Sequence, residues 1–165
     1  MGKITQTQDT RRIFIETITE LAEKDDKILL IVSDVGFNYI ELFKDKFPDR
    51  FINVGIAEEF MMIFASALAL DGWKPYVYSM INFVAFRPFE MVRNAVHYHN
   101  ANVKLLGVKG SSGYKMLGFS HNMKSEREDV DILGEYVDCH ISTVDDVEKI
   151  IRDTYKSGKA AYIRL

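Results

Sequence analysis

The stretch Phe51-Ile52-Asn53-Val54-Gly55-Ile56-Ala57-Glu58-Glu59 decides how the rest of the chain is interpreted. It begins with apolar and β-branched residues, which predict a short buried strand, and it turns at Gly55. A long apolar run from Phe60 to Leu70 follows and predicts a core helix. The stretch is therefore a strand, a turn and the entrance to a helix, with two carboxylates at that entrance.

Two interpretations fit a carboxylate at the start of such a helix. In the first, Glu58 and Glu59 are N-terminal charges that the helix dipole stabilises. In the second, one of them is held partly desolvated beside a bound cofactor, where its proton affinity is shifted for acid–base chemistry. Spacing alone favours the first interpretation.

Composition narrows the class of protein. The chain has 165 residues, of which 47% are hydrophobic and 27% charged, and this suits a single globular domain over residues 1–165. The net charge of −3 points to neither nucleic acid nor an anionic membrane. A single cysteine, Cys139, excludes an internal disulfide and a Cys-x-x-Cys site, and we expect no metal site on this chain. No signal-peptide pattern is seen, so the expected location is the cytoplasm.

Strand and helix patterns alternate along the whole chain. The predicted strands are 28–32, the start of the opening stretch, 76–78, 103–108, 139–142 and 161–165. The predicted helices are 10–24 (with Asp9 as N-cap), 40–47, 60–70, 89–99, 129–136 and 144–157. This order predicts an α/β fold, a doubly wound and mostly or wholly parallel sheet with helices on both faces. Ligands of such sheets gather at the carboxyl ends of the strands, so the post-strand segments 34–38, 55–59, 79–86 and 109–121 are the candidate site.

A family resemblance favours the second interpretation of the carboxylates. Asn53-Val54-Gly55-Ile56-Ala57-Glu58-Glu59, with a helix that closes in Asp71-Gly72-Trp73-Lys74-Pro75, resembles the thiamine-diphosphate pyrimidine-binding domain of transketolases and deoxyxylulose-phosphate synthases. The resemblance runs from about Thr10 to Leu165. It implies that Glu58 contacts the aminopyrimidine of thiamine diphosphate and exchanges a proton with its ring nitrogen, with Glu59 in a variable position.

The same resemblance gives roles to an aromatic segment. Met80-Ile81-Asn82-Phe83-Val84-Ala85-Phe86 is similar to the family's Phe-Leu-Asn-Phe-Val-Ser-Tyr segment. It implies that Phe83 stacks on the aminopyrimidine and that Phe86 is a second wall. Met80 replaces an aromatic residue, although a thioether also packs against rings. Without the resemblance, both phenylalanines are ordinary core candidates.

A later loop resembles the family's substrate-binding segment. Gly118-Phe119-Ser120-His121-Asn122 is similar to its Gly-x-x-His-Gln ending, which implies that His121 reaches the reacting oxygen of a sugar. Gly110-Ser111-Ser112-Gly113 lacks the pattern of a phosphate-binding loop and is interpreted as a source of flexibility. Met116-Leu117 stands where transketolases usually have an acidic pair, and this departure puts an ordinary pentose-phosphate substrate in doubt.

Two arginines are candidates for binding an anionic substrate. Arg11, in Thr10-Arg11-Arg12, resembles the family residue that grips a terminal phosphate, and Arg164 near the C-terminus resembles a second member of that clamp. A guanidinium binds phosphate or carboxylate in a bidentate manner. Solvated surface charge is the equally supported alternative.

The resemblance also implies partners. It covers one of the three domains of a full transketolase, and the Gly-Asp-Gly…Asn motif that holds Mg²⁺ and the diphosphate is missing from the 165 residues. We therefore expect the pyrimidine-binding subunit of a split enzyme, completed by a diphosphate-binding subunit in a heterotetramer of two plus two. The expected reaction is transfer of a two-carbon ketol unit between sugars or sugar phosphates. The alternatives are 2-oxoacid decarboxylation, acyloin formation, or a non-catalytic assembly subunit.

Overall fold

The computed structural model describes residues 9–109 and 114–165, so Gly110-Ser111-Ser112-Gly113 lies outside the described residues. Six strands form one sheet in the order β2-β1-β3-β4-β6-β5, and every neighbouring pair is parallel. The strands are β1 (Ile28–Val32), β2 (Phe51–Asn53), β3 (Lys74–Met80), β4 (Lys104–Val108), β5 (Asp138–Ile141) and β6 (Ala161–Arg164). The predicted parallel sheet is confirmed.

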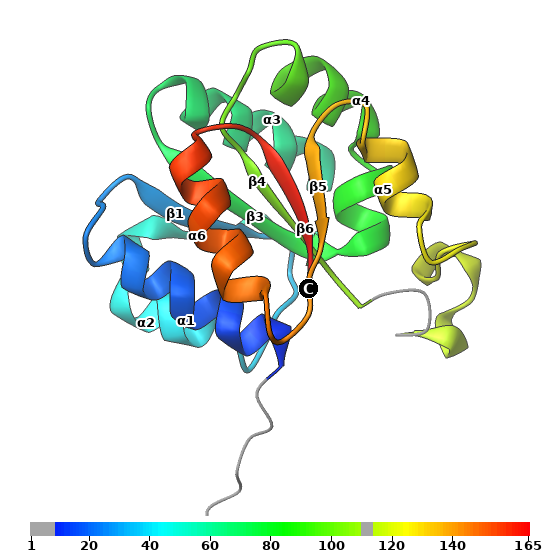
Figure 1. Cartoon of the computed structure of the whole chain (residues 1–165), viewed down its shortest axis with the longest axis horizontal. Helices are drawn as coiled ribbons and strands as arrows, with labels where there is room; N and C mark the ends of the chain where they lie inside the picture. Colours follow the sequence, from blue (N-terminus) through cyan, green and yellow to red (C-terminus); the bar gives the residue numbers. More distant parts are fainter. Residues whose placement is uncertain (1–8, 110–113) are drawn as a thin grey trace, which may run out of the picture.

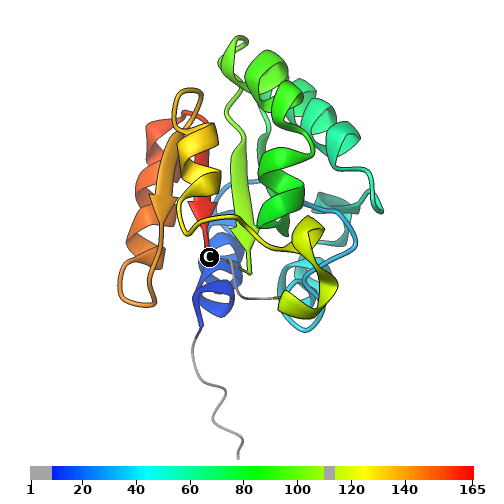
Figure 2. The ribbon, with the colours of Figure 1, turned by 90° about the vertical axis from the view of Figure 1, so that its right-hand side faces the viewer.

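Helices cover both faces of this sheet, as predicted (Figure 1, Figure 2). The α-helices are α1 (Thr10–Ala22), α2 (Glu41–Lys46), α3 (Glu58–Leu70), α4 (Phe89–Met91), α5 (Glu128–Leu133) and α6 (Val147–Ser157). The shorter turns are the 3₁₀ helices η1 (Pro48–Arg50), η4 (Lys115–Leu117) and η5 (Phe119–His121) and the π-helices η2 (Asn82–Phe86) and η3 (Val92–His97). The fold is a doubly wound α/β sheet.

Two apolar clusters hold the layers together, one on each face of the sheet. The first joins α1, α2 and α6 to the strands through Phe14, Phe43 and Ile151, all fully buried. The second joins α3, η3 and α5 to the other face, with Met61 and Leu133 among its fully buried members. Burial on both faces explains why β1 is a continuous apolar run.

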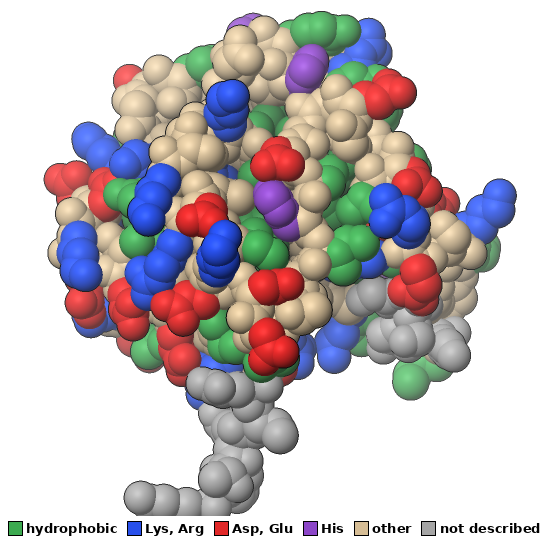
Figure 3. Space-filling model, viewed as in Figure 1, with side chains coloured by type: hydrophobic (Ala, Val, Ile, Leu, Met, Phe, Trp, Pro, Cys, Tyr) green, Lys and Arg blue, Asp and Glu red, His purple; other side chains and the backbone are tan. Residues whose placement is uncertain are grey.

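Charged side chains are interleaved on the face that carries α1 and α6 (Figure 3). Arg152 bonds both Glu20 of α1 and Glu148 of its own helix, at 2.6 and 2.8 Å. Lys149 pairs with Asp153 one turn further along α6. Opposite charges therefore neutralise one another across this helix pair. In the described part of the chain, no helix has the length and apolar character needed to cross a membrane.

Strand β3 is longer than the sequence predicts. It begins at Lys74 and includes Pro75. Lys74 donates its backbone N–H toward the β1 side, to Lys27 O at 2.8 Å, so the next residue's nitrogen faces β4. The pairing of β4 begins one residue later, at Tyr76 with Lys104. The N–H that proline lacks therefore has no partner to lose, and the strand tolerates it.

Two segments differ in type from the prediction. The post-strand segment 79–86 was expected to be a loop but forms the end of β3 and the π-helix η2, because its apolar residues Ile81, Val84 and Ala85 are fully buried. The predicted helix 89–99 is a short α-helical turn followed by the π-helix η3. Single π-turns frequently mark functional sites.

Candidate functional site

The candidate site lies at the carboxyl edge of the sheet, where β1, β2 and β3 end. Ser33 directly follows β1, and Ser79 is the last but one residue of β3. Their buried hydroxyls are hydrogen-bonded to each other at 2.7 Å. Strand order reverses between these two strands, because β2 lies to one side of β1 and β3 to the other. Such a switch point is where doubly wound sheets bind ligands.

The opening stretch delivers Glu58 to this edge. Gly55 has φ +69°, a left-handed conformation that costs glycine little, and its N–H donates to the Asn53 side chain at 3.0 Å. The same Asn53 oxygen accepts the backbone N–H of Asp34, which fixes the turn to the end of β1. Helix α3 then begins at Glu58, as its first residue. A tight, well-bonded turn therefore sets where the carboxylate lies.

The two neighbouring carboxylates have different surroundings. The side chain of Glu58 is 2% exposed and its Oε2 accepts a hydrogen bond from Nη1 of Arg87 at 2.6 Å. Glu59 is exposed. The two carboxylates of the first turn of α3 therefore differ in burial, which a helix-dipole role alone does not need.

Arg87, which the sequence did not single out, connects Glu58 to the aromatic segment. Its guanidinium lies over the ring of Phe83, with Cζ 4.0 Å from the ring centroid. The backbone N–H of Arg87 closes the π-turn by donating to Asn82 O at 3.2 Å. The four-residue spacing between Phe83 and Arg87 was the one signal that the sequence offered for their contact. The carboxylate partner of Arg87, Glu58, lies 29 positions earlier in the sequence.

The segment that carries His121 lies against the same aromatic ring. His121 meets Phe83 edge to face, with ring centroids 5.0 Å apart, and Tyr114 at 6.4 Å. The Nδ1 of His121 is 2.8 Å from the hydroxyl of Ser120. Asn82 donates to Asn122 O at 3.1 Å and so ties η2 to this segment. The structure thus forms one connected group, in which Arg87 joins Glu58 to Phe83 and His121 contacts Phe83 directly.

Met80 and Phe86 are placed differently from each other. Met80 is buried in the same apolar cluster against which Phe83 packs. Phe86 packs into the cluster on the other face of the sheet, with Phe89 and Tyr136 among the other partly buried members. Phe86 therefore contributes to the core on that face, and its role as a second wall of the cofactor site stays a prediction.

The two predicted substrate arginines have separate partners. Arg11 binds Asp9 at 2.6 Å and lies 4.3 Å from the ring centroid of Tyr39. Burial alone raises the pKa of Asp9, but hydrogen bonds from Tyr39, the backbone of Arg12 and Arg11 outweigh it and hold that pKa below its ordinary value. Asp9 is also the N-cap of α1, as predicted.

The side chain of Arg164 is largely buried and hydrogen-bonded within the protein. Its side chain is 11% exposed, and its Nη1 donates to Glu126 O at 2.7 Å and to Asp129 at 3.1 Å. Asp129 is fully buried and also accepts the hydroxyl of Tyr162 at 2.6 Å. These bonds hold α5 against β6. Arg164 and Arg11 have different partners, and their joint binding of an anionic substrate stays a prediction.

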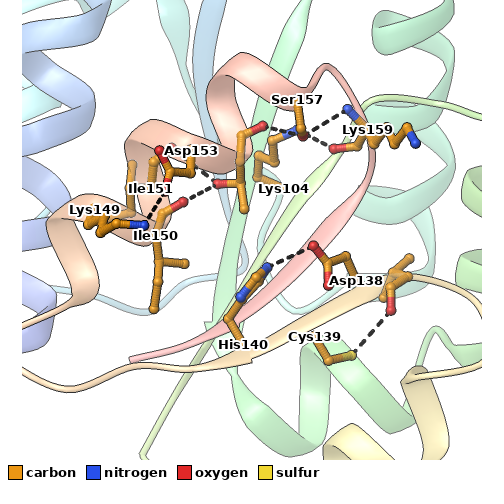
Figure 4. A network of polar contacts seen from close by, with 12 residues as sticks. Lys104, Asp138, Cys139, His140, Lys149, Ile150, Ile151, Asp153, Ser157 and Lys159 are labelled. Atoms are coloured by element: carbon orange, nitrogen blue, oxygen red, sulfur yellow. Dashed lines mark hydrogen bonds and ion pairs between the residues drawn. The ribbon is translucent and has the colours of Figure 1, made fainter.

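A second network of polar contacts involves residues of β4, β5 and α6 (Figure 4). Burial and the charges of Asp129 and Asp138 raise the pKa of the Cys139 thiol to about 12, so it is a poor nucleophile at neutral pH. Burial, together with Lys74, lowers the pKa of Lys104 to about 8, and its ammonium donates to Asn102 and to the carbonyl of Lys159. Within residues 9–109 and 114–165, no cluster of three His, Cys, Asp or Glu side chains could hold a metal ion.

Comparison with known families matches residues 6–128 to the transketolase pyrimidine-binding domain. The chain belongs to this family. Family membership implies dependence on thiamine diphosphate, and it identifies α3, which begins at Glu58, and η2 as parts of a pyrimidine-binding domain.

Individual relatives give the same family. A 1-deoxy-D-xylulose-5-phosphate synthase of Desulfitobacterium hafniense is 42% identical over 110 residues, which are 62% of this chain and 17% of the synthase. One subunit of an apulose-4-phosphate transketolase of Phocaeicola vulgatus is 34% identical over 113 residues, 68% of this chain and 36% of that polypeptide. The pyrimidine-binding domain thus spans well under half the length of these relatives.

A solved structure confirms the fold. A split-gene transketolase, described as an inactive β4 tetramer, superposes with a TM-score of 0.80 at 27% identity. The superposition covers 95% of this chain and 51% of that one. The predicted thiamine-diphosphate pyrimidine-binding fold is therefore confirmed.

Proposed function

We propose that this chain is the pyrimidine-binding subunit of a split transketolase-like enzyme, which transfers a two-carbon ketol unit between sugars with thiamine diphosphate. The observation that carries the proposal is the buried carboxylate of Glu58, joined through Arg87 to the ring of Phe83 at the carboxyl edge of the sheet. The similarity to one polypeptide of a multi-subunit transketolase and to a split-gene transketolase supports the split arrangement.

The residues of this group fit the aminopyrimidine ring of the cofactor. The guanidinium of Arg87 is a flat N–H donor, and it stacks on Phe83 while it donates to Glu58. An aminopyrimidine presents the same two features, a flat π-face and a nitrogen that shares a proton with a carboxylate. When bound, thiamine diphosphate supplies a nucleophilic carbon for attack on a carbonyl.

Each residue of the group has a role in the proposal. Glu58 holds the proton at the pyrimidine ring nitrogen, and its burial strengthens that interaction by excluding water. Phe83 stacks on the ring. His121 donates to the reacting oxygen of the substrate through Nε2, because Ser120 engages Nδ1. Arg11 binds the anionic end of a sugar phosphate.

A separate partner chain completes the site in this proposal. It holds Mg²⁺ and the diphosphate, and two copies of each chain form a cytoplasmic heterotetramer. Exposed apolar side chains around α3 support a docked partner, because they continue from the turn before Glu58 along the outer side of the helix. They are Ile56, Phe60, Ile63 and Leu70. An apolar surface of this kind is typical of an interface.

A second candidate reaction is decarboxylation of a 2-oxoacid or acyloin formation. It is favoured by Met116 and Leu117, which occupy the position of the family's acidic pair and are exposed. Neither side chain can accept a hydrogen bond from a sugar hydroxyl as a carboxylate does. The two reactions are separated by testing ketose donors and 2-oxoacids in parallel.

Calorimetry tests the split arrangement. The purified chain, titrated with thiamine diphosphate and Mg²⁺, is expected to bind only weakly, through the pyrimidine end of the cofactor, whereas a mixture with the diphosphate-binding chain binds tightly and turns over a ketose donor. Tight, Mg²⁺-dependent binding by the chain alone would contradict the proposal, as would a reconstituted complex that stays inactive toward both ketoses and 2-oxoacids.

A further inference from the structure

Arg87 makes both of the contacts that the proposed function reserves for the cofactor ring. Its Nη1 is 2.6 Å from Oε2 of Glu58, and its Cζ is 4.0 Å from the centroid of Phe83. A guanidinium over an aromatic face is held by the ring quadrupole, and a guanidinium–carboxylate hydrogen bond is among the strong ones. One carboxylate oxygen and one ring are therefore engaged by a residue of the chain itself.

We propose that the guanidinium of Arg87 occupies the aminopyrimidine position when the chain is free of cofactor, and that the cofactor binds by displacing it. The inference rests on the proposed function, which assigns Glu58 and Phe83 to the cofactor. Arg87 is thus an internal competitor of the cofactor ring.

The surroundings of Arg87 allow this exchange. Its side chain is 40% exposed, so the guanidinium can move into water, whereas Glu58 is 2% exposed and cannot. The backbone of Arg87 stays fixed by its bond to Asn82 O while the long side chain rotates. Motion is therefore confined to one side chain at the mouth of the site.

The exchange also explains how the buried carboxylate of Glu58 is stabilised before the cofactor binds. A buried charge that loses its partner is strongly destabilising. Arg87 provides that partner until the pyrimidine replaces it, so Glu58 is paired in both states. The consequence is a lower apparent affinity, because the cofactor binds the fraction of molecules in which Arg87 has moved away.

The test uses the full chain and the aminopyrimidine half of the cofactor, 4-amino-5-hydroxymethyl-2-methylpyrimidine. Binding is followed by NMR chemical shifts in wild type, Arg87→Ala and Arg93→Ala. Arg93 is a matched control, because it is an exposed arginine of the following helix that lies over Tyr98 and not over Phe83. Arg87→Ala is expected to bind the pyrimidine about tenfold more tightly than wild type, and Arg93→Ala as wild type does.

Thermal unfolding without ligand gives a second readout of opposite sign. Arg87→Ala is expected to unfold at a lower temperature than wild type and to recover part of that loss when the pyrimidine is added. Arg87→Lys keeps the charge but not the flat fork, so it should lie between wild type and Arg87→Ala in both measurements. The lysine variant keeps the test valid if the alanine variant does not fold.

The outcomes separate this inference from the proposed function. Equal or weaker pyrimidine binding by the Arg87 variants than by wild type overturns the displacement mechanism while leaving the cofactor site standing. Absence of pyrimidine binding in wild type and in both Arg87 variants overturns the site itself, and the displacement mechanism with it.

Discussion

Glu58→Gln is the change that tests the proposed chemistry most directly. In the wild-type chain, Nη1 of Arg87 donates to Oε2 of Glu58 at 2.6 Å. Glutamine keeps the size of the side chain and one oxygen that can accept this hydrogen bond. It removes the negative charge and with it the ability to exchange a proton with the pyrimidine nitrogen. Phe83 and the diphosphate contacts of the partner are untouched. We therefore expect binding of thiamine diphosphate to change by a few-fold at most.

The expected loss of turnover is much larger. Proton transfer by a positioned side chain contributes typically 10²–10⁴-fold, so turnover should fall by about 10²-fold or more. At 1.36 kcal/mol for each factor of ten, this fall is about 2.7 kcal/mol of activation free energy. Stability should change by no more than about 1 kcal/mol, because the substitution removes a charge from a buried site and Arg87 is partly solvated.

The assay is turnover of the reconstituted complex at saturating thiamine diphosphate and Mg²⁺, with the dissociation constant measured by calorimetry. Glu59→Gln is the matched control, because it makes the same charge change in the same helical turn at an exposed side chain. A helix-dipole effect of 0.3–1 kcal/mol would affect both variants alike. If both variants keep full turnover, Glu58 is not the proton-exchanging group; if Glu59→Gln alone is inactive, the motif has been aligned one residue out of register.

Three further predictions concern other parts of the chain. Phe83→Ala should weaken retention of thiamine diphosphate in the complex by roughly two- to tenfold, since stacking contributes about 0.5–1.5 kcal/mol beyond area burial; unchanged retention in a folded variant would make Phe83 a core residue. Arg164→Ala should cost about 2 kcal/mol of unfolding free energy, because it removes a partner from the buried carboxylate of Asp129. Arg11→Ala should cost less than about 1 kcal/mol of unfolding free energy. It should instead raise KM for a phosphorylated substrate more than for the neutral analogue of that substrate. Burial lowers the pKa of Lys104 to about 8. Between pH 8 and about 10.5 the folded chain therefore binds fewer protons than the unfolded chain, and its stability rises with pH. Urea unfolding at pH 7 and pH 10 should show that Lys104→Met lacks about 2 kcal/mol of this gain in unfolding free energy.

The fold was predictable because its signals are local. Continuous apolar runs such as Ile28–Val32 indicate strands buried on both faces, and their alternation with helical patterns leaves few topologies. The errors occur where tertiary context decides. Pro75 lies inside β3 because β4 starts one residue later, and the segment after β3 is a π-helix because its apolar side chains are buried. Neither fact can be read from the segment alone.

The candidate site was predictable only where a motif carries it. Glu58, Phe83 and His121 come from short segments with family counterparts, and the structure places all three in one connected group. The role of Arg164 in a substrate clamp stays a prediction. Its hydrogen bond to Asp129, 35 residues earlier in the chain, follows from no local pattern. Contacts of this range are fixed by how α5 packs on β6.

Arg87 follows η2 directly and lies where this segment meets α3. In a π-helix the hydrogen bond joins residues five apart, and here the N–H of Arg87 reaches Asn82 O at 3.2 Å. Residues four apart lie on the same face of a helical turn, so the side chains at positions 83 and 87 project from one side of this segment. That alignment lets one guanidinium cover the ring of Phe83 and still reach Glu58 at the start of α3. The helical segment after β3 therefore places Arg87 in contact with both Phe83 and the first residue of α3.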